Sequence, residues 1–119
     1  MRVYLDDLRT PPKDFTLVKD AKTAIDLITS CWEQIEEISL DHDLGDEAKV
    51  GSGYQVVCEM EDFVYNTRPT HLPYIHVHSA NPIGRKRMEY GIKNIERMIN
   101  AGDRYYKENK EELEKDDAN

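Results

Sequence analysis

The chain alternates short β-type runs with longer segments of helical hydrophobic spacing, and this alternation restricts the possible folds most strongly. We expect strands at residues 2–5, 15–18, 38–40 and 74–78. Helical patterns follow Asp20, begin again near Ser52, and follow Gly84 until the pattern fades after Gly102. Strands separated by helices favour a parallel sheet with right-handed crossovers, so the sequence predicts an α/β fold.

The link between the first two predicted strands is unusual because residues 8–14 are too few for a helix. Thr10, Pro11 and Pro12 also prevent a helix from starting there. One face of the sheet therefore loses a covering helix. The strands agree, since apolar residues alternate with polar or aromatic ones, whereas a fully buried parallel strand is apolar on both faces. We expect the last helix, or a partner, to cover the weaker face, in a fold of two or three layers.

Length and charge limit the function. The 119 residues suffice for one self-standing core, and we expect an α/β domain over 1–102 followed by a charged helical extension or tail over 103–119. The net charge is −8, which disfavours duplex DNA as a partner. No stretch approaches the roughly 20 apolar residues that span a bilayer, and the N-terminus lacks a signal-like run. We therefore predict a cytoplasmic protein with no membrane role.

Chemically distinctive residues gather after three of the predicted strands. In an open parallel sheet, ligands bind at the carboxyl ends of the strands. The candidates are Asp6, Asp7 and Arg9 after the first strand, Asp41, His42 and Asp43 after the third, and His78, Ser79, Asn81 and Arg85 at and beyond the end of the fourth. Four carboxylates at one edge repel one another, so we expect a bound cation, and Mg²⁺ or Mn²⁺ suits oxygen ligands best.

Several of these residues have simpler interpretations. Imidazole suits proton transfer near neutral pH, so His42 and His78 are candidate catalytic groups, but a hydrogen-bonded structural histidine is the alternative for each. Asp6 and Asp7 also have the composition of a solvated turn. His78 forms an H-x-H pair with His76, a possible zinc half-site, although His76 is expected to point away from the strand end.

Basic residues at the start of the last predicted helix are unexpected, because the helix dipole favours acidic ones there. We interpret Arg85 as an anion-binding residue, while surface ion pairs are the simpler interpretation for Lys86 and Arg87. Other phosphate motifs fail. Gly51-Ser52-Gly53 lacks a third glycine, and no Walker-type Gly-Lys-Ser/Thr occurs.

The pattern of an acidic pair after the first strand, an Asp ending the third, and Ser-Ala ending the fourth resembles the receiver domain of response regulators. Three fuller motifs are similar to the divergent cyclic-phosphate processing receiver domains. They are LDD-L-R near the start, SLDHDLG in the middle, and HSANPIGR-x-x-M near the end, and together they span roughly residues 1–98.

The resemblance implies a truncated receiver-like, flavodoxin-like fold with a four-stranded parallel sheet in the order 2-1-3-4. It lacks the first helix, and it lacks the fifth strand with its Lys. By position, Asp6, Asp7 and Asp41 resemble the receiver's Mg²⁺ ligands, Asp41 its phospho-acceptor, and Ser79 its conserved hydroxyl residue. His42, His78, Asn81 and Arg85 are not receiver features. The divergent family implies action on a cyclic phosphate of a nucleotide or RNA end.

The leading hypothesis is therefore a metal-dependent phosphoesterase that hydrolyses such a cyclic phosphate. In it, Mg²⁺ or Mn²⁺ is held by Asp6, Asp7, Asp41 and Asp43, phosphate is bound by Arg9, Ser79, Asn81 and Arg85, and catalysis is carried by His42, His78 and Asp41. Asp43 alternatively orients one imidazole, and Asp41 is either a ligand or a nucleophile. One rival is a non-catalytic module that binds the same nucleotide or RNA end. The other is a degenerate phospho-acceptor receiver.

Overall fold

A computed structural model describes the backbone of residues 1–108 and the side chains of residues 1–102. The strands are β1 (Arg2–Leu5), β2 (Phe15–Val18), β3 (Glu37–Leu40) and β4 (Tyr74–Val77). The helices are α1 (Ala21–Ser30), a 3₁₀ turn η1 (Trp32–Gln34), α2 (Glu47–Val50), α3 (Gly53–Thr67) and α4 (Pro82–Glu108). Among these helices, none combines the length and the hydropathy needed to cross a bilayer.

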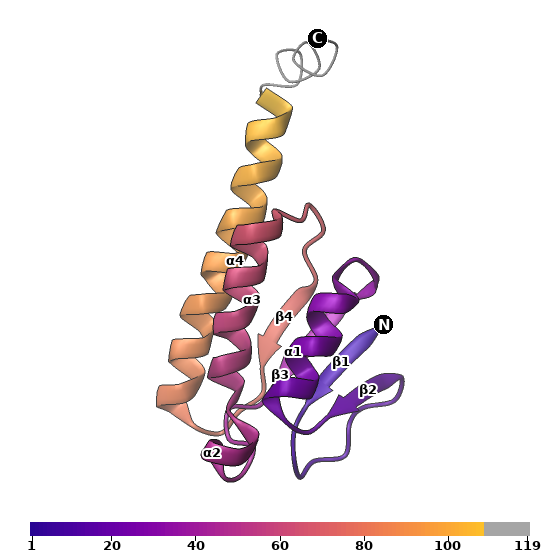
Figure 1. Ribbon diagram of the computed structural model, residues 1–119, viewed down its shortest axis with the longest axis vertical. Helices are drawn as coiled ribbons and strands as arrows, with labels where there is room; N and C mark the ends of the chain where they lie inside the picture. Colours follow the sequence, from indigo (N-terminus) through magenta and orange to yellow (C-terminus); the bar gives the residue numbers. More distant parts are fainter. Residues whose placement is uncertain (109–119) are drawn as a thin grey trace.

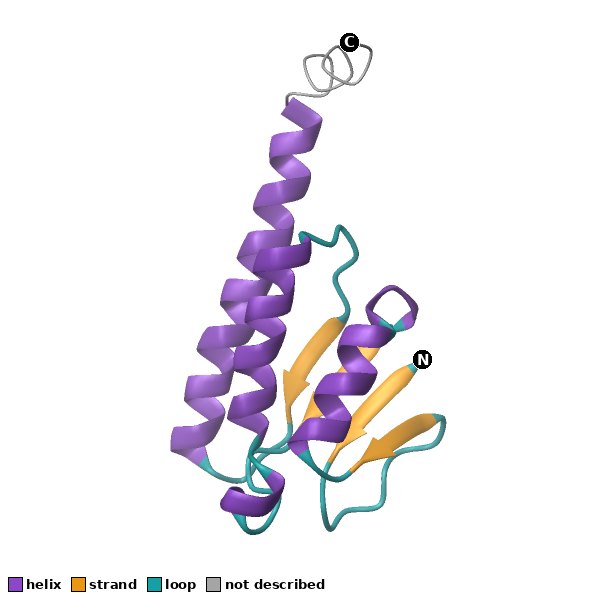
Figure 2. Ribbon diagram, viewed as in Figure 1, coloured by secondary structure: helices purple, strands orange, loops and turns teal. Residues whose placement is uncertain are grey.

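All the strands run parallel in the order β2-β1-β3-β4, which confirms the predicted α/β, receiver-like fold. Leu5 pairs with Leu40, and Leu40 pairs with Val77, so the strand ends lie level with one another. Figure 2 shows the loops that follow the strands meeting at this edge. The carboxyl ends of β1, β3 and β4 therefore bring their following residues together.

The helices pack on one face of the sheet. Figure 1 shows α1 and α3 lying across that face, with α4 alongside α3 next to β4. The core joins the apolar sides of the strands to the inner faces of the helices, and it includes Leu5, Leu40, Ile28, Met60 and Ile95, none of which is exposed. The described part of the chain thus forms two layers.

The opposite face of the sheet is not covered by α4, contrary to one of our two expectations. The apolar stripe of α4, including Met88 and Ile95, is buried in the same core as Ile75 and Val77. On the other face of β4, Tyr74 remains 64% exposed. This open face carries the alternating polar and aromatic residues of the strands.

Element boundaries depart from the sequence prediction in places. α1 and α3 begin where the sequence predicts helices, and Asp20 and Ser52 cap them by accepting hydrogen bonds from the N–H groups of Thr23 and Gln55. The apolar helical spacing in the sequence continues to Ile35, but α1 ends at Ser30, and a 3₁₀ turn carries the buried Trp32.

The ends of the last strand and of the last helix also differ. β4 stops one residue earlier than predicted, at Val77, and α4 starts earlier, at Pro82, since proline is well tolerated in the first turn of a helix. α4 then continues through Gly102 to Glu108. The rest of the predicted extension, residues 109–119, lies outside the described residues. The short helix α2 was not predicted.

The start of α3 is fixed against the end of β3. The N–H of Gly53 donates a hydrogen bond to the carbonyl of His42 (2.9 Å), and Ser52 bridges to Asp43. A Cβ added at Gly53 would overlap the backbone carbonyl of Asp41. This close approach requires glycine, and it holds the loop that carries the acidic residues.

Gly53→Ala is therefore expected to lower the free energy of unfolding by about 2 kcal/mol or more, because a backbone atom has to move. Gly102 is the matched control, since a Cβ there meets no atom within 4 Å. Gly102→Ala should raise stability by up to about 1 kcal/mol through helix propensity. Urea unfolding of both variants measures the contrast, and equal effects would contradict the packing argument.

Candidate functional site

Asp6, directly after β1, is the centre of the site. It is only 1% exposed, and its carboxylate accepts four hydrogen bonds. The backbone N–H groups of Leu8 and Arg9 donate to Oδ1 at 2.8 and 2.9 Å. Arg9 Nη1 and His78 Nε2 donate to Oδ2, both at 2.9 Å. The turn that follows β1 is thus folded around one buried charge.

His78, at the end of β4, is held on three sides. Its Nε2 contacts Asp6, and its Nδ1 lies 2.7 Å from the hydroxyl oxygen of Ser39. The ring also stacks almost parallel on Tyr4, with ring centres 4.4 Å apart. Tyr4 and Ser39 are paired residues on the open face of the sheet. The sequence analysis did not assign either residue to the site, although the period-two alternation of the strands places both on the same face of the sheet as His78.

Asp41, directly after β3, is the second buried carboxylate and is 7% exposed. Its Oδ1 accepts the backbone N–H of His42 at 2.8 Å, and its Oδ2 lies 3.4 Å from Arg9 Nη1. Ligand atoms of Asp6, Asp41 and His78 all fall within 4.8 Å of one another. These three residues form a group that could hold a metal ion, and the Arg9 guanidinium bridges its two carboxylates.

The two buried carboxylates differ in their pKa. Burial raises the pKa of Asp41, and the nearby negative charge of Asp6 raises it further. Burial also acts to raise the pKa of Asp6, but the hydrogen bonds from Arg9, Leu8 and His78 outweigh it and hold that pKa well below its usual range. The site therefore holds one firmly ionised carboxylate beside one whose charge is poorly compensated, which is a situation that a cation would relieve.

An open pocket of about 490 Å³ lies beside this group. Its walls include Asp6, Arg9 and Asp41, and also four further predicted site residues, Asp7, Asp43, Ser79 and Asn81. Ser79 Oγ accepts the backbone N–H of Asn81, and Asn81 Oδ1 accepts that of Gly84, so the last loop is folded by its own polar side chains. The structure brings the predicted metal-binding residues to a single pocket.

Three predicted site residues are not part of the pocket walls. His78 reaches the pocket only through Asp6, to which its Nε2 is hydrogen-bonded. The ring of His42 packs against Gly84, and its Nδ1 contacts Asp43 Oδ1 at 2.8 Å. Arg85 pairs with Glu89 one turn later on α4, through a 2.9 Å contact. The local ion pair gives Arg85 a surface role in the structure as described.

The zinc alternative has no support from the geometry. His76 Nε2 pairs with Glu37 at 2.8 Å, and its ring stacks on Tyr74. Within the part of the chain that the structure describes, the group able to hold a metal contains His78 and excludes His76.

The architecture and the site define a receiver-like domain with an acidic pocket at the carboxyl edge of its sheet. The family model of the cyclic-phosphate processing receiver domain matches residues 1–94. The chain belongs to this family, as the sequence motifs indicated. Searches of curated proteins and of solved structures found no match.

The contrast between the carboxylates predicts opposite effects of two similar substitutions. Asp6→Asn should lower the stability of the metal-free protein by about 1–3 kcal/mol, because the amide cannot accept from both Arg9 and His78. Asp41→Asn should raise it, by on the order of 1 kcal/mol, because a poorly compensated buried charge is removed. Urea unfolding at pH 7 without divalent ions measures both effects, and changes of the same sign would contradict the assignment.

Acid should shrink both differences. The folded-state pKa of Asp6 is depressed, so its stabilisation is complete above the unfolded value of 3.8 and is lost as the pH falls through the folded value. The folded-state pKa of Asp41 is raised, so the cost of its charge is present at neutral pH and disappears as the pH falls towards 3.8. Unfolding of wild type and of both variants from pH 7 to pH 3 measures how each difference in the free energy of unfolding changes with pH.

Proposed function

We propose that this protein is a metal-dependent phosphoesterase that opens a cyclic phosphate of a nucleotide or of an RNA end. The observation that carries the proposal is the group of two buried carboxylates, an imidazole and a bridging guanidinium beside an open pocket. Membership of a receiver family associated with cyclic-phosphate processing supports the substrate class. Hydrolysis adds water across one P–O bond of the ring and leaves a phosphomonoester beside a free hydroxyl.

The donor set fits a divalent cation. Asp6, Asp41 and the rim residue Asp7 offer carboxylate oxygens, which suit Mg²⁺ or Mn²⁺. His78 belongs to the same group, but in this proposal its Nε2 stays hydrogen-bonded to Asp6 and does not bind the cation. When bound, the cation would neutralise charge on the phosphoryl oxygens. Asp43, also on the pocket wall, is placed to bind the cation through water or to orient His42.

The phosphate would be bound by the remaining polar groups of the pocket. Arg9 reaches both buried carboxylates while about half of its side chain remains exposed, so it can also donate to a phosphate oxygen. Ser79 and Asn81 line the pocket from the loop that follows β4.

His78 is the better placed histidine for proton transfer. Its contacts with Asp6 and Ser39 fix the orientation of the ring, which would transfer a proton during hydrolysis. His42 lies behind Gly84 with Asp43 as its partner, and it reaches the pocket in this proposal only through that carboxylate. Asp41 serves as a ligand or, in a covalent route, as a nucleophile.

A binding module without turnover is the second candidate, and one observation favours it. Both ring nitrogens of His78 are already engaged, one by Asp6 and one by Ser39. A ring held in this way orients a metal-binding carboxylate without transferring protons.

Divalent ions should stabilise the folded protein. At a concentration about 100 times the dissociation constant, Mg²⁺ or Mn²⁺ should add about 2.7 kcal/mol to the free energy of unfolding. Asp41→Asn should abolish this gain, whereas Asp14→Asn, in the loop before β2 and outside the pocket, should keep it. Thermal unfolding against metal concentration measures the effect, and an unchanged response in Asp41→Asn would exclude the proposed site.

Turnover should be tested with 2′,3′-cyclic and 3′,5′-cyclic nucleotides in the presence of Mg²⁺ or Mn²⁺. His78→Ala should lower kcat about 100-fold or more, as loss of a proton-transfer group does. His76→Ala, two residues earlier and within β4, is the matched control, and it should leave kcat unchanged.

The rivals give different results in the same experiments. Ligand bound by calorimetry and recovered unchanged after hours would favour the binding module. A mass increase on Asp41 with a small phosphodonor would favour a phospho-acceptor receiver.

A further inference from the structure

Helix α4 carries a local excess of positive charge in an acidic protein. Residues 85–97 contain five basic and two acidic side chains, a net charge of +3, although the whole chain carries −8. Arg85 is paired with Glu89. The other four cations of this segment form no ion pair with any of residues 1–102, whose side chains the structure describes. They are Lys86, Arg87, Lys93 and Arg97. Unneutralised cations gathered on one helix attract a polyanion.

Three of these cations, Arg87, Lys93 and Arg97, line a groove between α3 and α4 with a volume of about 400 Å³. Lys86 lines a second pocket that shares Tyr90 and Lys93 with the groove. Among the residues that the structure describes, the one carboxylate on the groove wall belongs to Glu61, which accepts a hydrogen bond from Asn94.

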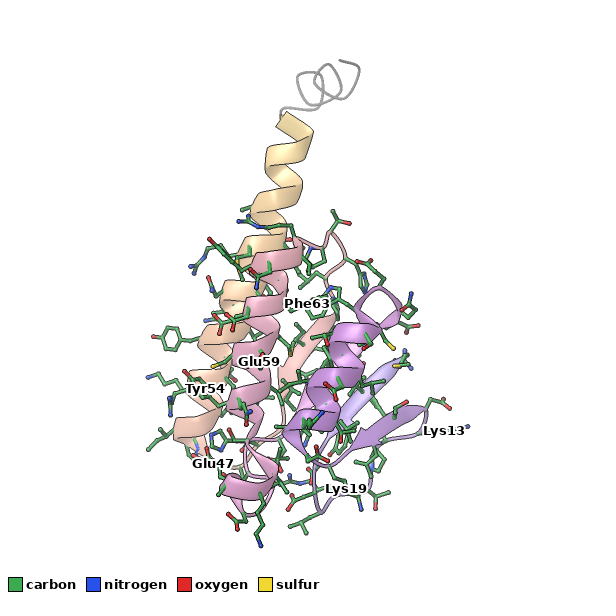
Figure 3. The ribbon with its side chains drawn as sticks, in the orientation of Figure 1. Lys13, Lys19, Glu47, Tyr54, Glu59 and Phe63 are labelled. Carbon is green, nitrogen blue, oxygen red and sulfur yellow. The ribbon has the colours of Figure 1, made fainter. Side chains whose placement is uncertain are left out.

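Two aromatic rings lie among the cations. Tyr54, near the start of α3 (Figure 3), packs under the Arg87 guanidinium, which lies 4.1 Å from the ring centre. Tyr90 is 70% exposed on α4. Rings and cations alternating along one surface suit single-stranded nucleic acid, because bases stack on the rings while phosphates meet the cations.

The spacing gives the surface a direction. Lys86, Tyr90, Lys93 and Arg97 follow one another at helical intervals of four, three and four residues, so they lie along one stripe of α4. The stripe is about 16 Å long at 1.5 Å per residue, which matches about five nucleotides of a stacked strand at 3.4 Å each. α4 begins at Pro82, immediately after the loop of Ser79 and Asn81 that lines the acidic pocket.

We propose that the α3–α4 groove binds the single-stranded RNA segment that precedes a terminal cyclic phosphate, so that the substrate is an RNA end and not a free nucleotide. This inference rests on the proposed phosphoesterase function. The acidic pocket, with a cation bound, would hold the terminus, and the basic groove would supply the affinity for RNA that a protein of net charge −8 otherwise lacks. A 2′,3′-cyclic terminus requires a ribose 2′-hydroxyl, which makes RNA the matching polymer.

The test compares two charge-reversal variants of the full chain. Lys93→Glu/Arg97→Glu alters two cations of the groove wall. Lys13→Glu/Lys19→Glu makes the same change in net charge on the β2 side of the molecule (Figure 3), away from both the groove and the pocket walls. The probes are a 5′-fluorescent eight-nucleotide RNA with a 2′,3′-cyclic phosphate end, and the cyclic mononucleotide.

In fluorescence anisotropy, the groove variant should bind the RNA at least tenfold more weakly, and the control should bind within about twofold of wild type. The slope of log K against log salt should fall by about 1.4, because two phosphate contacts are lost at about 0.7 each. Tyr90→Ala should weaken binding about fivefold or more through lost stacking. In turnover, the groove variant should raise KM for the RNA while leaving kinetics on the mononucleotide unchanged.

The outcomes separate this inference from the proposed function. Equal loss of RNA binding in both double variants, or RNA and mononucleotide turned over with the same kcat/KM, would overturn the groove while leaving the phosphoesterase intact. RNA binding that depends on the groove, with neither probe hydrolysed, would reject the phosphoesterase and retain the RNA site. Stronger binding of an acidic peptide than of the RNA would overturn the RNA assignment.

Discussion

The buried charge of Asp6 is the constraint on which the site depends. A carboxylate excluded from water is tolerable only if its oxygens are hydrogen-bonded, and here two backbone N–H groups, a guanidinium and an imidazole meet that need. Satisfying it folds the turn after β1, brings Arg9 back over the sheet edge, and ties the end of β4 to the end of β1. Asp41 then enters a position where its own charge is poorly compensated. The same contacts that stabilise the fold therefore assemble a group of residues that could hold a cation.

No helix lies between β1 and β2, and this absence affects the other face of the sheet. With the helices on one face, the other face of the sheet is free to carry polar and aromatic side chains. On this face Tyr4 stacks on the ring of His78, and the hydroxyl group of Ser39 contacts its Nδ1. In a three-layer fold these positions would be apolar and would pack under a helix. The absence of a helix between β1 and β2 thus leaves room for the two side chains that hold the imidazole of His78.

Particular residues show how far sequence reasoning reached. The carboxyl-edge rule placed Asp6, Asp41 and His78 together, because parallel strands deliver their following residues to one edge whatever their separation in the chain. The same rule did not show that His42 and Arg85 lie outside the pocket walls. It predicts the edge of the sheet at which a residue lies, but not the direction of its side chain. His42 turns towards Gly84, and Arg85 pairs along its own helix. Side-chain direction depends on packing partners from other elements, which local patterns do not contain.

From the sequence alone followed the α/β class, the edge at which the chemistry gathers, and the family, because hydrophobic periodicity, strand-end residues and short motifs are local properties of the chain. Only the tertiary structure decided that the helices share one face of the sheet. It also decided that the pKa of Asp6 is lowered while the pKa of Asp41 is raised, and that cations of α4 border a groove with Tyr54. Each of these depends on contacts between residues distant in sequence, whose distances and burial arise only when the layers pack together.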